Sequence, residues 1–140
     1  MPLEPREPHR SFDDERMGMT PQELFDCALE LPGALDDEAF GPGATVFKVE
    51  GKVFAILQDA TDDQPAQVTL KCDPNLALHL RDQYPAVGPG YHVNKRHWNT
   101  VVLDSTVPSP AVREMVEHSW DRVVSGMTKA DRERLRLQRG

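Results

Sequence analysis

The sequence lacks the features that mark several classes of protein. Only two of its 140 residues are cysteines, Cys27 and Cys72, which is too few for a disulfide framework, and their separation fits no zinc motif. No apolar run approaches the roughly 20 residues that span a bilayer. The first 20 residues carry eight charges and no apolar block of the kind found in signal peptides. We therefore expect a cytoplasmic protein with reduced thiols and no membrane contact.

Catalytic motifs are missing as well. The chain has no G-x-S-x-G elbow, no Walker loop and no G-x-G-x-x-G motif. Cys27 would need a base and an orienting partner to act as a nucleophile, and its place beside the apolar face of a predicted helix favours a buried thiol. We expect a protein that is not an enzyme and that holds neither a cofactor nor a metal ion.

Charge is distributed unevenly. The formal net charge is −7, and residues 21–40 carry six acids and no base. In contrast, residues 84–103 carry two bases and no acid, and residues 128–140 carry five bases and two acids. An acidic total disfavours broad non-specific binding to nucleic acid, which depends on neutralising phosphates with Lys and Arg. A local basic surface remains compatible with an anionic ligand.

Helix start signals and apolar periodicity predict four helices. Thr20-Pro21-Gln22-Glu23 combines a capping box with proline at the first helical position. The predicted helices begin at Thr20-Pro21, Asp73-Pro74, Ser109-Pro110 and Thr128, and the first three end at Pro32-Gly33, before Tyr84-Pro85 and near residue 126.

Alternating and β-rich segments predict the strands. They are Asp36–Phe40, Thr45–Val49, Lys52–Leu57, Ala66–Cys72 and Trp98–Leu103. Glu50-Gly51 indicates a tight hairpin, whereas residues 59–64 and 85–90 are predicted loops. Short connections favour an α+β domain with a mainly antiparallel sheet of about five strands packed against helices. We expect residues 1–19 to form a mobile charged tail and residues 20–140 to form a single domain.

Residues 90–101 are the most informative stretch for function. No carboxylate lies between Tyr91 and Asn99, and every polar side chain there can donate a hydrogen bond. Such a cluster complements a phosphate, a carboxylate or an acidic surface. Arg96 would bind bidentately, Lys95 would act as a point charge, and the histidines would tune affinity with pH. The candidate binding residues are Tyr91, His92, Asn94, Lys95, Arg96 and His97.

The same residues have structural interpretations. Tyr91 and Trp98 can be packed aromatics, and the histidines can bond backbone carbonyls while the two cations are solvated. A metal site at His92 and His97 is disfavoured because their spacing fits no common zinc pattern. Glu114, His118 and Asp121 share one side of the long helix, and a surface ion pair is the favoured interpretation there.

The chain resembles the MmcQ/YjbR family over roughly residues 20–128. The resemblance rests on Leu31-Pro32-Gly33, on the hairpin Val46–Ala55, on Ser119–Val124 and above all on Gly90–Val101 with its Asn-Lys-x-His-Trp core. A tyrosine is more usual at the position of Trp120. The resemblance implies a small α+β fold, CyaY-like and similar to type III secretion chaperones. It also brings the label "DNA-binding, double-wing" for proteins of largely unestablished function, and no catalytic residues.

Three functional hypotheses follow. The first is a non-enzymatic protein that binds DNA or another phosphate-bearing ligand through the 90–99 cluster. The second is a protein-interaction module that forms a homo-oligomer or binds another protein. The third is a small-anion sensor or enzyme, and it requires a pocket in which His92, His97 and Arg96 converge.

Overall fold

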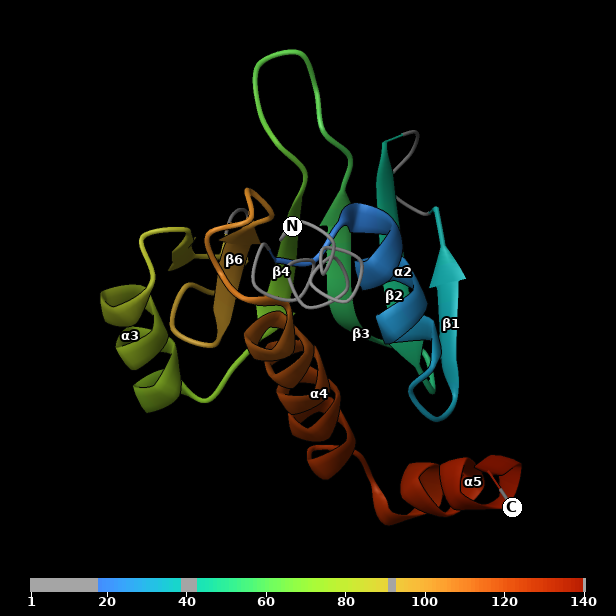
Figure 1. Cartoon of the computed structure of the whole chain (residues 1–140). Coiled ribbons are helices and arrows are strands. Elements are labelled where there is room, and N and C mark those ends of the chain that lie inside the picture. The colour runs from blue at the N-terminus through green and yellow to red at the C-terminus, as the bar shows by residue number, and fades with distance from the viewer. Residues whose placement is uncertain (1–17, 39–42, 91–92, 140) are drawn as a thin grey trace, which may run out of the picture.

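The computed structural model describes residues 18–38, 43–90 and 93–139 (Figure 1). The helices in these ranges are α2 (Pro21–Leu29), α3 (Pro74–Gln83), α4 (Ser109–Ser125) and α5 (Lys129–Arg139). The strands are β1 (Ala34–Asp37), β2 (Ala44–Val49), β3 (Lys52–Gln58), β4 (Gln67–Lys71), β5 (Val87–Pro89) and β6 (Trp98–Val102).

All six strands belong to one antiparallel sheet in the order β1-β2-β3-β4-β6-β5. The α+β class and the antiparallel sheet are confirmed, with one strand more than expected. The additional strand, β5, lies within residues 85–90, which we predicted to be a loop. Its Gly88 and Pro89 are turn-forming residues, but β5 is an edge strand, where proline is tolerated because one side of the strand needs no ladder bond.

The predicted hairpin between β2 and β3 is confirmed. Glu50 and Gly51 have φ values of 50° and 77°, the left-handed conformation that a two-residue type I′ turn requires at both positions. The register shifts between Phe47 and Lys48, so Phe54 joins the core beside Phe47, with ring centroids 6.4 Å apart. The bulge thus adds a large apolar side chain to the buried face.

Side-chain caps fix three of the helix starts. Thr20 and Glu23 form the predicted capping box of α2, Asp73 accepts from the first backbone N–H groups of α3, and Thr128 accepts from Asp131 N. Helix α4 differs, because Pro108 is its N-cap and makes no side-chain bond. The helix begins at Ser109, as predicted, but Ser109 lies inside the first turn and does not cap it.

Helices α2 and α4 cover one face of the sheet, and α3 packs on β5 and β6 (Figure 1). The apolar stripe that recurs along α4 at helical spacing packs on the sheet: Val112, Met115, Val116 and Val123 are buried, and Trp120 and Val124 are half-buried. Full burial of a Leu, Val or Phe side chain contributes about 1.5–3 kcal/mol, so this layer is the main source of stability. Its largest fully buried apolar side chains are Phe47, Phe54, Leu24, Val49, Val68, Val101, Val112 and Val116.

A buried serine joins α4 to the middle of the sheet. The pairing of β3 with β4 ends at Ala55 and Leu70. One residue further, the hydroxyl of Ser119 donates to Phe54 O and accepts from Lys71 N at 2.8 Å. Ser119 is fully buried, and its hydroxyl replaces a missing ladder bond between the two strands.

The two ends of the described chain are tied to the domain in different ways. Of the expected tail, residues 1–17 lie outside the described residues, while Met19 is buried in the core. At the other end, Leu135 of α5 is buried and Arg134 pairs with Glu50 at 3.0 Å. None of the described helices is long and apolar enough to cross a membrane.

Candidate functional site

The predicted binding segment begins outside the described residues. Tyr91 and His92 both fall there. From Asn94 onward the chain makes a tight turn: Asn94 Oδ1 accepts from Arg96 N at 2.9 Å, and Asn94 O accepts from His97 N at 3.2 Å. The Asn94 amide oxygen thus holds the turn, which presents Lys95 and Arg96 to solvent.

His97 has a different place from the two cations. It is half-buried, and its carbonyl accepts from Cys72 N at 2.7 Å, which extends the pairing of β4 and β6 by one residue. Its imidazole does not line the hollow that Lys95 and Arg96 line. The structure therefore brings Lys95 and Arg96 together and leaves His97 outside their site.

Lys95 and Arg96 line a surface hollow of about 290 Å³, which we call the cation hollow. A third cationic side chain, Arg81 of α3, lines it as well. None of the described lining residues is acidic. The lining residues are Pro74, Asn75, Leu78, Arg81, Lys95 and Arg96.

Arg81 is held firmly in this hollow. Its Nε donates to Asn99 Oδ1 at 2.7 Å, and its Nη2 donates to Lys95 O and, at 3.3 Å, to Trp98 O. These contacts connect α3 to the turn that carries the other two cations. Nη1 has no acceptor among the described residues, so it can donate to an external ligand. A guanidinium fixed in this way binds an anion with little loss of side-chain entropy.

The other two cations are held less tightly. Among the described residues, Lys95 Nζ donates only to Gly90 O, at 3.2 Å. The Arg96 guanidinium bonds or pairs with no described residue. The hollow thus combines one fixed guanidinium with two adaptable cations, a combination that suits a phosphate-like anion.

Sequence reasoning found Lys95 and Arg96 but missed Arg81. Arg81 lies 14 residues before Lys95 and within a helix whose charges look like an ordinary solvated face. Asn75 was missed for the same reason, because it lies in the first turn of α3. Only the packing of α3 on β6 places these side chains beside the turn.

The turn approaches β6 so closely that Gly90 has no room for a side chain. A Cβ atom on Gly90 would lie 2.6 Å from Val93 Cγ2 and 2.7 Å from Trp98 Cβ. Gly90 N also donates to Trp98 O at 2.9 Å. The glycine is therefore required for the start of β6, and thus for the position of the turn that follows it.

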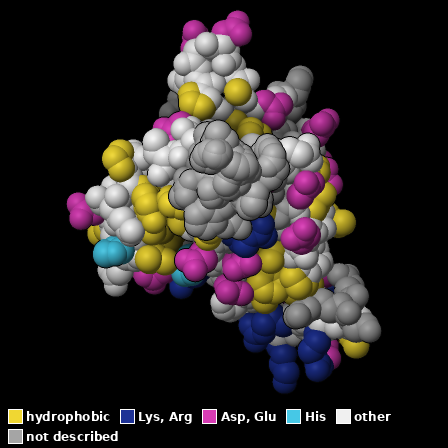
Figure 2. Space-filling view, viewed as in Figure 1, with side chains coloured by type: hydrophobic (Ala, Val, Ile, Leu, Met, Phe, Trp, Pro, Cys, Tyr) yellow, Lys and Arg dark blue, Asp and Glu magenta, His cyan; other side chains and the backbone are white. Residues whose placement is uncertain are grey.

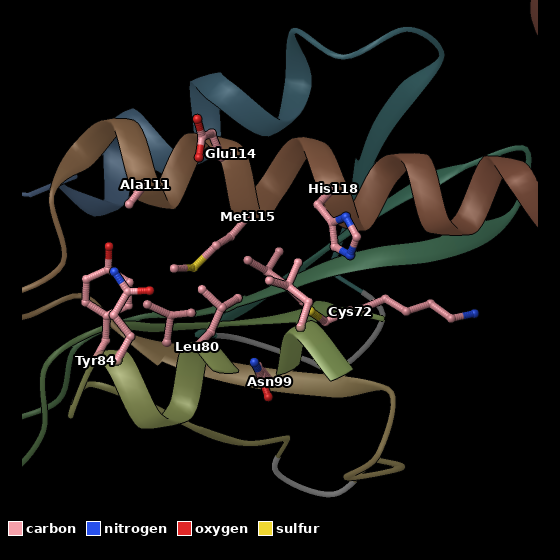
Figure 3. A pocket seen from close by; sticks show the side chains of 13 residues that line it. Cys72, Leu80, Tyr84, Asn99, Ala111, Glu114, Met115 and His118 are labelled. Atoms are coloured by element: carbon pink, nitrogen blue, oxygen red, sulfur yellow. The ribbon is translucent and has the colours of Figure 1, made fainter. Parts of the chain in front are cut away.

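A second cavity, of about 230 Å³, lies between α3 and α4 over β4 and β6; we call it the helix cavity. Figure 3 shows Met115, Leu80 and Tyr84 around it, with Cys72 and His118 at one end. Figure 2 shows a group of hydrophobic side chains at the surface between the two helices. The residues that line the helix cavity are Leu70, Lys71, Cys72, Leu76, Leu80, Gln83, Tyr84, Asn99, Val101, Ala111, Glu114, Met115 and His118.

Cys72 and His118, at one end of the helix cavity, are both in their neutral forms at pH 7. Burial, and then the charge of Asp73, raise the pKa of Cys72 to about 11. Burial is also the main cause that lowers the pKa of His118, and Arg122 lowers it further. His118 Nε2 accepts from Asp73 N at 3.1 Å. The interpretation of His118 as a surface ion-pair partner is therefore wrong, because the ring is half-buried and accepts a backbone N–H.

Both thiols are buried and unpaired. Burial raises the pKa of Cys27 as well, which agrees with the expected buried thiol rather than a nucleophile. The described residues include no group of three His, Cys, Asp or Glu side chains that could hold a metal ion.

Comparison with known proteins gives consistent matches. A family model described as YjbR matches residues 29–122. The uncharacterized protein YbdF of Escherichia coli O157:H7 is 38% identical over 109 residues, covering 78% of this chain and 88% of that protein. The uncharacterized protein YjbR of Escherichia coli K12 is 36% identical over 117 residues, covering 84% and 98%.

Solved structures match over a similar length. The crystal structure of Deinococcus radiodurans protein DR2400, with a DUF419 domain, has a TM-score of 0.77 and 35% identity, covering 86% of this chain and 91% of that one. A crystal structure of a Pseudomonas syringae protein has a TM-score of 0.64 and 27% identity, covering 72% and 96%.

Proposed function

The chain belongs to the YjbR family, and we propose that it is a non-enzymatic binding protein that holds phosphate groups in the cation hollow, with DNA as the leading ligand. The observation that carries this proposal is the grouping of Arg81, Lys95 and Arg96 around one hollow without a described acidic residue in its lining.

The chemistry of the three side chains suits phosphate oxygens. Arg81 offers a pre-positioned N–H group, Arg96 offers a fork that can bind two oxygens, and Lys95 adds a mobile point charge. Asn75 of the first turn of α3 also lines the hollow and can donate through its amide. No nucleophile or acid–base pair is required for this role, because the ligand is held and not transformed.

A neighbouring hollow favours a ligand with several phosphates over a single ion. It measures about 330 Å³, and its lining includes Lys52, Lys71 and Trp98. Trp98 lies two residues after Arg96 along the chain and lines this second hollow. Successive phosphates of a nucleic acid strand would contact both hollows, and Trp98 would offer an apolar surface in the second. Figure 2 shows several Lys and Arg side chains close together at the start of α5, where they form a further basic region of the surface.

The test is binding of a labelled, random-sequence DNA duplex at 50 and 200 mM salt. About three neutralised phosphates give a slope of about −2.7 in log affinity against log salt, or a loss of about 40-fold between the two concentrations. The double substitution Lys95→Ala/Arg96→Ala should weaken binding and reduce the magnitude of the slope by about 1.8.

A matched control separates the site from net charge. Lys48→Ala/Arg113→Ala removes the same charge from β2 and α4, where the two side chains pair with Asp37 and Glu30. The control should bind DNA with nearly unchanged affinity and slope. An equal loss of DNA affinity in both double variants would contradict a phosphate site in the cation hollow. So would an affinity that does not change with salt.

A second candidate function, as a protein-interaction module, is favoured by one edge of the sheet. Strand β1 is an edge strand, and its Leu35 is 71% exposed. An exposed edge can pair with a strand of another chain. Self-association through this edge predicts a mass in solution above the 15.7 kDa of one chain, and Leu35→Lys should reduce that mass. A strictly monomeric wild-type protein would count against self-association.

The third hypothesis, a small-anion sensor or enzyme, requires His92, His97 and Arg96 to converge. His97 does not line the cation hollow, and His92 lies outside the described residues. The anion in this hypothesis would be held by Arg81, Lys95 and Arg96 instead. Inorganic phosphate in place of DNA tests it, since a sensor should bind the free ion at low millimolar concentration or below.

A further inference from the structure

The helix cavity has the construction of a ligand site. Helix α4 packs on β3 and β4, whereas α3 packs on β5 and β6. The two helices are therefore supported by different parts of the same sheet, and the space between them has a floor formed by Leu70 and Val101. Rigid strands below and helices on both sides keep such a space open without a ligand.

The size of the cavity limits what fits. Its volume is about 230 Å³, and an apolar protein cavity of about 150 Å³ is large enough to bind benzene. One aromatic ring with a few substituent atoms therefore fits, whereas an α-helix, with a diameter of about 10 Å, does not. The size therefore favours a small molecule and excludes a helical segment of a protein.

The walls define the chemistry of the ligand. Leu76, Leu80, Ala111 and Met115 surround the centre of the cavity with apolar atoms. A methionine sulfur there favours contact with an aromatic ring. At one end the hydroxyl of Tyr84 points toward α4 near Ala111 (Figure 3). It forms no hydrogen bond with a described residue, so it can bond a polar group of the ligand.

The charges around the cavity favour a neutral ligand. Cys72 and His118 are both neutral at pH 7 at the opposite end, because burial raises the pKa of the thiol and lowers that of the imidazole. Glu114 contributes a negative charge to the lining and Lys71 a positive one, so the two formal charges cancel.

We propose that the helix cavity binds a small neutral aromatic molecule with one hydroxyl or similar hydrogen-bonding group, whose ring contacts Met115 and whose polar group bonds Tyr84. This site is separate from the cation hollow, because no lining residue is common to the two. Helix α3 contributes to both, with Leu76, Leu80 and Gln83 lining the cavity and Arg81 lining the hollow.

The test uses p-cresol as the probe and full-length protein labelled with carbon-13 at the methionine methyl groups. A saturable shift of the Met115 methyl resonance is expected, with a dissociation constant of about 0.1–1 mM for a ligand of this size. Met127 and Met19 are buried elsewhere, so their resonances should not follow the same curve. A linear, non-saturating shift of Met115 would overturn the proposal.

Two variants locate the site. Ala111→Phe fills the cavity and should weaken p-cresol binding at least tenfold, while Ala60→Phe, in an exposed loop, should leave it unchanged. Tyr84→Phe should weaken p-cresol severalfold and leave toluene binding unchanged, because toluene has no hydroxyl. If Ala111→Phe fails to fold, Tyr84→Phe still tests the proposal. Equal effects of Tyr84→Phe on the affinities for p-cresol and toluene would overturn the assigned hydrogen bond and the site.

Discussion

Arg81 and Asn99 form the contact on which the cation hollow depends. Arg81 Nε donates to Asn99 Oδ1 at 2.7 Å, and Asn99 Nδ2 donates to Ala77 O at 3.3 Å. Asn99 is 3% exposed, so this amide fixes α3 to β6 from inside the domain. A side chain that shapes the surface site is thus itself part of the buried structure.

Asn99→Leu should destabilise the protein and disturb the hollow together. The substitution removes the acceptor of Arg81 Nε and the donor to Ala77 O, and a buried group left without its partner costs about 1–3 kcal/mol. Urea unfolding measures the change in the free energy of unfolding. The control is Gln58→Ala, which removes an exposed amide bonded to Gln67 and should change stability by less than about 0.5 kcal/mol. Similar losses in both variants would contradict the buried role of Asn99.

Ser119→Ala should be destabilising although it removes one oxygen atom. Phe54 O and Lys71 N would both lose the hydroxyl that bridges them, at a cost of about 1–3 kcal/mol. Ser125→Ala is a matched control on the same helix, because Ser125 is exposed and its hydroxyl donates to Asp121 O of that helix. Equal unfolding midpoints for the two variants would show that the bridge contributes nothing to stability.

The sequence predicted the features that depend on neighbouring residues. The capping box of α2, the hairpin at Glu50-Gly51 and the buried stripe of α4 are local patterns, and all three are confirmed. It did not predict contacts between distant segments. Strand β5 exists because β6 pairs with it, and Arg81 joins Lys95 because α3 packs on β6. Nothing in the residues adjacent to Gly88 or Arg81 indicates either contact.

Gly90→Ala should destabilise the chain and weaken phosphate binding at the same time. The new methyl group would overlap Val93 and Trp98, so the start of β6 and its turn must shift, which typically costs about 1–3 kcal/mol. Gly88→Ala is the control, because a Cβ there meets no atom within 4 Å. The midpoint temperature of thermal unfolding and the affinity for DNA should both be lower for Gly90→Ala and unchanged for Gly88→Ala. Unchanged unfolding in Gly90→Ala would contradict the close approach of the turn to β6.

Stability should fall as the pH drops below about 6.5, in part because of His118. Burial is the main cause that lowers its pKa from the model-peptide value of 6.5, Arg122 adds to the effect, and Asp73 and Asp121 oppose it. Between the folded and unfolded pKa values the unfolded chain binds more protons, so the free energy of unfolding rises with pH and is fully restored above about 6.5. Urea unfolding from pH 5 to 8 measures this slope.

His118→Gln should flatten that dependence, because glutamine keeps an acceptor for Asp73 N and does not titrate. His79→Gln, on the exposed face of α3, should retain the wild-type slope. The pKa of Asp73 is itself lowered, chiefly by the backbone N–H of Leu76, so its contribution is lost only as the pH falls further, through the lowered pKa. A slope between pH 5 and 6.5 that is the same in His118→Gln and wild type would therefore place the proton uptake elsewhere, since Asp73 remains ionised in that range.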